Sequence, residues 1–182
     1  MRAGLIGNSE QNRFSVTRFS GGKMYKIPVS VLVVIHTPDM QVLLLERADH
    51  PGYWQSVTGS QNEGETLVQT AVREVAEETG LDASGYPLID CGIQNEYEIY
   101  EEWRWRYAPE VTHNTEHVFG LLVPEPVPVK LAAREHLDFV WLPWREAMEK
   151  VFSPSNAEAI RRLALSSECS PTNQPEPGTQ EN

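Results

Sequence analysis

The apolar run at residues 29–35, VSVLVVI, constrains the fold of this chain more than any other segment. Its β-branched side chains predict a strand, and the near absence of alternating polar residues predicts that both faces of this strand are buried. A sheet that contains such a strand must be covered on each side by other elements. The chain is therefore expected to fold in layers around a buried sheet.

The other patterned segments predict a central helix with strands before, around and after it. Residues 66–79 are expected to be helical, because Thr66 and Gln69 can form a capping box and Gly80 can end the helix. Further helices are expected at residues 146–152 and 155–165. Further strands are expected at residues 42–45, 88–91, 94–100, 117–123 and 137–142, with residues 103–107 as a partner strand. This order indicates an α/β fold with a mixed sheet covered on both faces.

A single folded domain is expected, because 182 residues leave little room for a second core. We place this domain at residues 24–166. Residues 1–23 lack the apolar stretch of a secretory signal and predict a flexible leader, so Met24 is an alternative start. Residues 167–182 have few apolar side chains and predict a disordered tail.

The charge of the chain excludes some classes of function. Its 26 acidic and 15 basic residues give a formal net charge of -11, which argues against coating a nucleic acid backbone. An anionic small molecule is still a possible ligand, because a divalent metal ion can bridge it to acidic side chains. No apolar run is long enough to span a bilayer. The two cysteines make no disulfide framework, which favours a reducing, cytoplasmic setting.

The predicted central helix carries a cluster of carboxylates on one side. Helical spacing brings Glu77 and Glu78 beside Glu74, while the apolar residues of the helix lie on the adjoining side. Like charges at this spacing weaken a helix, and a bound cation would reverse that effect. A solvated acidic face is the ordinary explanation for three such glutamates alone.

The residues around this cluster follow a longer pattern. Its fixed positions are Gly59, Glu65, Arg73, Glu74, Glu77, Glu78 and Gly80, with Val75 and Leu81 at its two variable apolar positions. This spacing resembles the signature of the Nudix hydrolases, enzymes that cleave a nucleoside diphosphate linked to another group. The resemblance implies an α/β/α sandwich with a mixed sheet, and it implies Mg²⁺ as the cofactor, with Mn²⁺ as an alternative.

The same resemblance implies roles for individual residues. The metal ligands would be Glu74, Glu77, Glu78 and Glu135, the last of these in the loop before the final strand. Either Glu78 or Glu135 would act as the general base, and the sequence leaves both open. Arg73 would orient the acids by pairing with Glu65, the alternative being an ordinary surface ion pair.

The segments at residues 28–35, 53–65 and 106–116 resemble the bacterial Nudix members of folate biosynthesis. Those members remove pyrophosphate from 7,8-dihydroneopterin triphosphate and leave the monophosphate. A triphosphate needs cations and hydroxyls beyond the metal, and a flat pterin ring needs aromatic neighbours. The resemblance therefore implies substrate contacts from Lys26, Arg47, Thr58, Tyr97, Glu98, Ile99, Tyr100 and Ser153, although Ser153 could instead be a simple helix cap.

Three other functions are compatible with parts of the sequence. The nearest is a broader enzyme that hydrolyses nucleoside triphosphates to clean the nucleotide pool, so the expected partner is a pterin or nucleoside triphosphate. A Nudix domain that only senses a ligand would be expected to lose some of the acids, all of which are present here. An acidic Ca²⁺-binding protein would bind metal without hydrolysis. We expect His113, His117 and His136 to be structural.

Overall fold

The strand predicted from the apolar run lies at the centre of the sheet. The computed structural model describes residues 17–18 and 24–165. In it, β3 (Val29–His36) pairs in parallel with β8 (His113–Leu122) on one side and antiparallel with β6 (Val57–Ser60) on the other. Most of β3 is fully buried, as its composition predicts.

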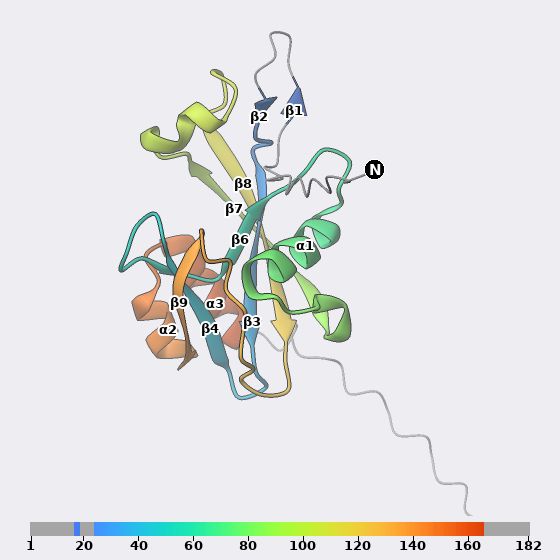
Figure 1. Ribbon diagram of the computed structural model, residues 1–182, viewed down its shortest axis with the longest axis vertical. Coiled ribbons are helices and arrows are strands. Elements are labelled where there is room, and N and C mark those ends of the chain that lie inside the picture. Colours follow the sequence, from blue (N-terminus) through green and yellow to red (C-terminus); the bar gives the residue numbers. More distant parts are fainter. Residues whose placement is uncertain (1–16, 19–23, 166–182) are drawn as a thin grey trace, which may run out of the picture.

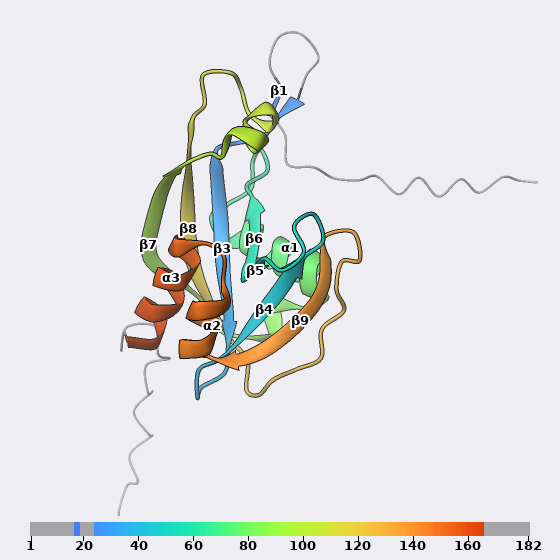
Figure 2. The same ribbon diagram turned by 90° about the vertical axis from the view of Figure 1, so that its left-hand side faces the viewer.

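The sheet has seven strands, and it opens where β3 and β4 separate. β3 and β4 (Gln41–Arg47) pair at His36 and Val42, next to the turn that joins them, and then diverge (Figure 2). Past that point β4 pairs instead with β9 (His136–Pro143) and with the short β5 (Trp54–Gln55). β7 (Leu88–Glu98) forms the far edge beside β8. The sheet is therefore mixed, with a gap between its two halves.

Helices cover both faces of this sheet (Figures 1 and 2). On one face, α1 (Leu67–Thr79) packs its Ala71 and Val75 into a core with alternate residues of β3. On the other, α2 (Trp144–Lys150) and α3 (Pro154–Leu165) pack against the intervening residues of β3. The structure thus confirms the α/β/α sandwich with a mixed sheet.

The ends of α1 are fixed by the residues that predict them. Thr66 Oγ1 accepts a hydrogen bond from the backbone N–H of Gln69, and the Gln69 side chain accepts one from the N–H of Thr66. Gly80 then ends the helix with a φ of 70°, a left-handed conformation that favours glycine. These caps set the two ends of α1, the helix that carries the carboxylates.

The prediction of a strand at residues 103–107 is wrong. Those residues belong mainly to a 3₁₀ helix, η2 (Glu101–Arg106), which begins as the N–H of Trp103 bonds to the carbonyl of Tyr100. The alternating aromatic residues suggested a strand, but Trp105 points to solvent, where the Arg106 guanidinium lies over its ring. A second 3₁₀ turn, η1 (Ala83–Gly85), follows α1.

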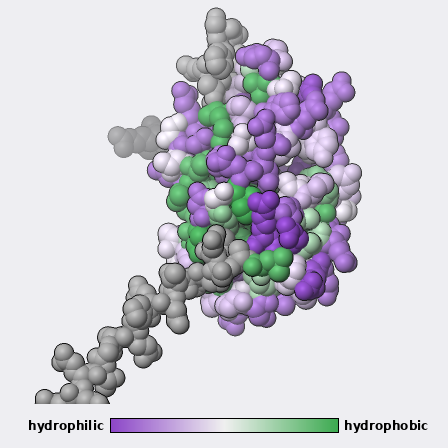
Figure 3. Space-filling view, turned by 180° about the vertical axis from the view of Figure 1, so that it is seen from behind, coloured by the Kyte–Doolittle hydropathy of each residue, from purple (hydrophilic) through white to green (hydrophobic). Residues whose placement is uncertain are grey.

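The expected tail and most of the expected leader lie outside the described residues. Within the leader, β1 (Thr17–Arg18) is described and pairs with β2 (Met24–Tyr25). Among the described residues, no helix combines the length and the apolar character needed to cross a membrane. The face of the molecule opposite to the view of Figure 1 is mainly hydrophilic, with small hydrophobic patches (Figure 3).

Candidate active site

The gap between the two halves of the sheet opens into a cleft of about 1110 Å³. This volume is large for a small-molecule pocket, which typically holds roughly 300–1,000 Å³. All site residues predicted from the sequence line it: Lys26, Arg47, Thr58, Arg73, Glu74, Glu77, Glu78, Tyr97, Glu98, Ile99, Tyr100, Glu135 and Ser153. Residues more than one hundred positions apart in the chain therefore meet at one surface.

A carboxylate cluster lines part of the cleft. Glu74 and Glu78 come from successive turns of α1 and are buried, whereas Glu77 on the same side of the helix is more exposed. Glu135 joins them from the residue before β9. One possible ligand atom each from Glu78, Glu135 and His136 lie within 4.8 Å of one another. The predicted metal ligand Glu135 thus lies close to Glu78.

His136 is a site residue that the sequence analysis took as structural. It is 4% exposed, and its Nε2 lies 3.0 Å from Oε2 of Glu78. Neither atom has a hydrogen-bond partner with regular geometry among the described residues, so the contact is one of charge and proximity. In the sequence, the position of His136 next to Glu135 was the feature that could have identified it as a residue of the cleft.

The cluster fits a divalent cation. Oε2 of Glu78 is a buried carboxylate oxygen with no hydrogen-bond partner in the part of the chain that the structure describes. Burial raises the pKa of this carboxyl, while the contact with His136 lowers it. Burying a carboxylate without a partner is costly. A hard cation would supply the missing partner, because Mg²⁺ and similar ions prefer carboxylate oxygens. The donor set of Glu74, Glu78 and Glu135 therefore suits such an ion.

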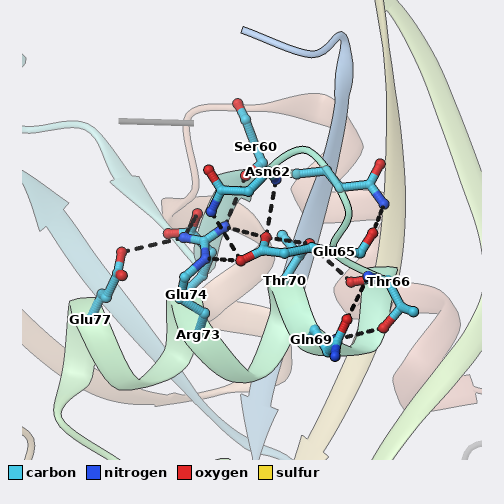
Figure 4. Close-up of polar contacts among 10 residues, drawn as sticks. Ser60, Asn62, Glu65, Thr66, Gln69, Thr70, Arg73, Glu74 and Glu77 are labelled. Carbon is cyan, nitrogen blue, oxygen red and sulfur yellow. Dashed lines mark hydrogen bonds and ion pairs between the residues drawn. The ribbon is translucent and has the colours of Figure 1, made fainter. Parts of the chain in front are cut away.

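Arg73 holds the acids of the site in place (Figure 4). Its guanidinium donates to both carboxylate oxygens of Glu65 at 2.8 and 3.0 Å, and to Glu74 Oε1 at 2.7 Å. It also donates to the carbonyl of Ser60 at 3.0 Å and lies 3.3 Å from Glu77. An isolated surface ion pair would have one partner. Arg73 is instead a hub that ties the loop before α1 to the carboxylates on the helix.

The pKa values of the two main partners of Arg73 are shifted in opposite directions. The hydrogen bonds from Arg73 lower the pKa of Glu65 to about 2, so Glu65 stays ionised. Burial raises the pKa of Glu74 to about 8, although the charge of Arg73 opposes this shift and that of Glu78 adds to it. Glu65 is therefore a positioning residue, while Glu74 is a carboxylate that a bound cation would return to its ionised form.

Gly59 leaves space that Glu74 occupies. A Cβ atom at Gly59 would lie 1.8 Å from Cδ and 1.9 Å from Oε1 of Glu74. The backbone of β6 therefore passes directly against the Glu74 side chain, and any other residue would displace it. This close approach, rather than a turn, explains the first glycine of the signature.

Basic and hydroxyl side chains line the cleft near the carboxylates. Lys26 Nζ lies 3.4 Å from Ser60 Oγ, and burial together with the neighbouring Arg106 lowers the pKa of Lys26. The Arg47 guanidinium donates to Asp49 at 2.7 and 2.9 Å and to Gln55 at 2.9 Å. These contacts hold both cations at the cleft wall, where an anionic ligand could reach them.

The hydroxyl groups that the resemblance implies are also part of the wall. Thr58 Oγ1 accepts a hydrogen bond of 3.3 Å from Gln55 Nε2, so it lies beside the partner of Arg47. Ser153 Oγ and Ser155 Oγ are 2.8 Å apart at the start of α3. The hydroxyl of Ser153 thus faces another hydroxyl at the cleft.

Aromatic side chains also line the cleft. The rings of Tyr100 and Trp103 meet edge to face, with centroids 5.4 Å apart, and Arg47 lies over Trp103. Ile99 is buried, while Glu98 forms an ion pair with Arg104. From the sequence, Trp103 was one of several aromatic candidates for the ring contact, and Tyr97 and Tyr100 were favoured over it because most aromatic side chains belong to the core.

Deeper in the cleft lies a polar group that the sequence analysis did not name. Asn114 Nδ2 donates to Ser30 Oγ at 2.7 Å and to the Tyr97 hydroxyl at 3.1 Å. Burial, together with the nearby charge of Glu116, raises the pKa of Tyr97 to about 12. Alternate polar residues in an otherwise apolar strand were the signal for Asn114 and Glu116.

A family model for the NUDIX domain matches residues 26–163. The chain therefore belongs to the Nudix family, as its sequence signature, its fold and the carboxylates of its cleft indicate. Members of this family use divalent metal ions.

Two of the similar proteins carry one name. The dihydroneopterin triphosphate diphosphatase of Escherichia coli (strain K12) is 47% identical over 146 residues, which cover 79% of this chain and 96% of that protein. The protein of that name from Haemophilus influenzae is 46% identical over 142 residues, covering 76% of this chain and 88% of that protein. A solved structure of the E. coli dihydroneopterin triphosphate pyrophosphohydrolase superposes with a TM-score of 0.72 at 46% identity, covering 79% of this chain and 99% of that one.

Proposed function

We propose that this chain is a Mg²⁺-dependent dihydroneopterin triphosphate diphosphatase of folate biosynthesis. It would hydrolyse 7,8-dihydroneopterin triphosphate to dihydroneopterin monophosphate and pyrophosphate. The observation that carries this proposal is the 47% identity to the E. coli enzyme along 96% of that enzyme's length. A cleft lined by both carboxylates and aromatic rings supports it, because the substrate has a polyphosphate and a flat ring.

Glu74, Glu78 and Glu135 would hold the metal ion, with Glu77 beside them at the surface of α1. When bound, Mg²⁺ supplies a positive charge that neutralises the polyphosphate and lowers the pKa of a coordinated water. Arg73 keeps Glu74 and Glu77 in place through its contacts with both. Lys26 and Arg47 would neutralise the phosphates that lie farther along the cleft.

Of the two candidate bases, we propose Glu135. Its side chain is exposed at the cleft, where it can reach a water molecule, whereas Glu78 is fully buried against His136. In the proposed step Glu135 takes a proton from water as the water oxygen bonds to phosphorus. The anhydride oxygen between the α- and β-phosphates then leaves with its electron pair, so pyrophosphate and the monophosphate are released.

A comparison of substrates tests the proposal against a broader nucleotide-cleaning enzyme. We expect kcat/KM for 7,8-dihydroneopterin triphosphate to exceed the values for dATP and dGTP by about tenfold or more, measured with Mg²⁺. A parallel series with Mn²⁺ shows whether that ion supports the same preference. Equal kcat/KM values across the panel would instead assign the chain to nucleoside triphosphate hydrolysis.

A further inference from the structure

On one face of the sheet, the side chains change from apolar to polar where the cleft begins. On the face of β3 that α3 covers, Leu32 and Val34 belong to the core. One step nearer the start of the strand, Ser30 faces the cleft and is paired in register with Glu116 of β8. Asn114 lies two residues before Glu116 on the same face of β8. These side chains form the floor of the cleft next to the first residues of α3.

Glu116 is a buried carboxylate that can accept further hydrogen bonds. It is 5% exposed, and it receives one hydrogen bond of 3.3 Å from Asn95 Nδ2 and another from the hydroxyl of Ser155. A carboxylate offers about four acceptor positions, so two donors leave room for more. Burial raises the pKa of Glu116 despite these two bonds. Additional N–H donors from a ligand would therefore stabilise its ionised form.

Asn114 adds a second acceptor that has no partner. It is 2% exposed, and both hydrogen bonds of its Nδ2 go to hydroxyl groups, those of Ser30 and Tyr97. Its Oδ1 is buried and accepts no hydrogen bond within the described part of the chain. A buried carbonyl oxygen without a donor is costly, which points to a partner from outside the chain. The floor of the cleft thus presents hydrogen-bond acceptors, and a ligand that carries hydrogen-bond donors would fit it.

We propose that Glu116 and Asn114 recognise the 2-amino-4-oxopyrimidine edge of the substrate ring. This edge carries two adjacent donors, the N3–H and the 2-amino group, which match the two oxygens of one carboxylate. The second hydrogen of the 2-amino group is then available to Oδ1 of Asn114. The assignment rests on the proposed function, because it names the residues that contact the pterin ring of that substrate.

The same floor explains which bases would be rejected. Adenine presents an amino group next to an unprotonated ring nitrogen, so one carboxylate oxygen of Glu116 would face a lone pair. A site built to bond a donor discriminates strongly against an analogue that lacks it, because its buried acceptors are then unpaired. The residues proposed to contact the ring edge are distinct from the proposed metal ligands, which come from α1 and from the residue before β9.

Binding of the ring alone tests this assignment without turnover. The probes are neopterin, whose fluorescence reports binding, and its lumazine counterpart, in which oxygen replaces the 2-amino group. Both are titrated in the presence of EDTA, so that no metal ion contributes. The wild-type protein is expected to bind neopterin about tenfold or more tightly than the lumazine. Equal affinities for the two probes in the wild-type protein would overturn the assignment.

The matched variants are Glu116→Gln and Glu96→Gln. Each replaces one carboxylate oxygen of the side chain with an NH₂ group. Glu116→Gln is expected to weaken neopterin binding about tenfold and to lose the preference over the lumazine. Glu96 is exposed on β7 and does not line the cleft, so Glu96→Gln is expected to bind both probes as the wild type does. Unchanged preference in Glu116→Gln would contradict the assignment. Failure of the wild type to hydrolyse the pterin triphosphate would instead count against the proposed function, since the titration does not require hydrolysis.

Discussion

Glu78 is the residue on which the metal site depends most directly. It is 3% exposed, it lies against His136, and its Oε2 has no hydrogen-bond partner within residues 17–18 and 24–165. A side chain in this position costs folding free energy, because a carboxylate is removed from water without full compensation. We infer that the cost is retained because the site needs the charge.

Replacing this charge should separate activity from stability. Glu78→Gln keeps the volume of the side chain but removes the negative charge, so we expect it to abolish Mg²⁺-dependent release of pyrophosphate. The melting temperature without metal should stay the same or rise, because a buried charge is lost. Pyrophosphate assays and thermal unfolding check the two parts. Full activity in the variant would remove Glu78 from the mechanism.

Gly59 shows how a residue without a side chain can determine the site. Gly59→Ala would place a methyl group where Glu74 now lies, so Glu74 must move. Because the colliding atoms are the end of a flexible side chain, we expect little loss of stability. We expect kcat to fall about 10- to 100-fold, since the displaced carboxylate no longer supports the metal site. Assays of kcat beside thermal unfolding test this, and Gly85→Ala, where a Cβ meets nothing within 4 Å, is the control.

At the scale of elements, α1 and the loop before it act as one unit. The capping box fixes the first turn, and Arg73 joins the second turn to Glu65 in the loop. Glu65 also accepts hydrogen bonds from both the backbone and the side chain of Asn62. The loop is therefore held at three points before the carboxylates of α1 begin.

The pairing of Glu65 with Arg73 should be visible in the pH dependence of stability. The pKa of Glu65 is about 2 in the folded chain and 4.5 ordinarily, so its contribution is present above pH 4.5. This contribution is lost as the pH falls from 4.5 towards 2, because the carboxylate gains a proton and Arg73 loses an ionised partner. We expect Glu65→Gln to be less stable at pH 7 by about 1–2 kcal/mol and to show a flatter decline in acid.

Urea unfolding without metal, at several values between pH 7 and pH 2, measures this difference. Glu63→Gln is the matched control, because Glu63 is an exposed carboxylate in the same loop. The account is contradicted if the curves for Glu65→Gln and Glu63→Gln have the same shape.

At this scale, the sequence predicts well the features that depend on residues close together in the chain. The limits of α1 follow from Thr66, Gln69 and Gly80, and the spacing of its acids is set by the helix itself. The failure at residues 103–107 has a physical reason too, since alternating aromatic residues indicate a strand only when one face is buried. Here Trp105 is 66% exposed, and the segment instead follows 3₁₀ geometry.

At the scale of the whole molecule, the site depends on the divergence of β3 and β4. The two strands meet at their turn and then pair with different partners, which opens the cleft between the halves of the sheet (Figure 2). The metal ligands of α1 and Glu135 meet at one side of this opening, and the floor formed by β3 and β8 lies within it. No single segment of the chain contains the site.

This geometry explains which site residues sequence reasoning could not identify. The carboxylates of α1 were predictable because one short pattern contains them. His136, Asn114 and Glu116 were not, because each acquires its role from a tertiary contact: His136 from Glu78, Asn114 from Ser30 and Tyr97, and Glu116 from Ser155. Burial of polar atoms without partners becomes visible only when the fold is known.

The most direct test of the central claim is to identify the products of one reaction. The purified chain is incubated with 7,8-dihydroneopterin triphosphate and Mg²⁺, and pyrophosphate and orthophosphate are measured separately. We predict one pyrophosphate for each dihydroneopterin monophosphate formed, with no reaction after addition of EDTA. Release of orthophosphate as the primary product, or turnover that is unaffected by EDTA, would contradict the account.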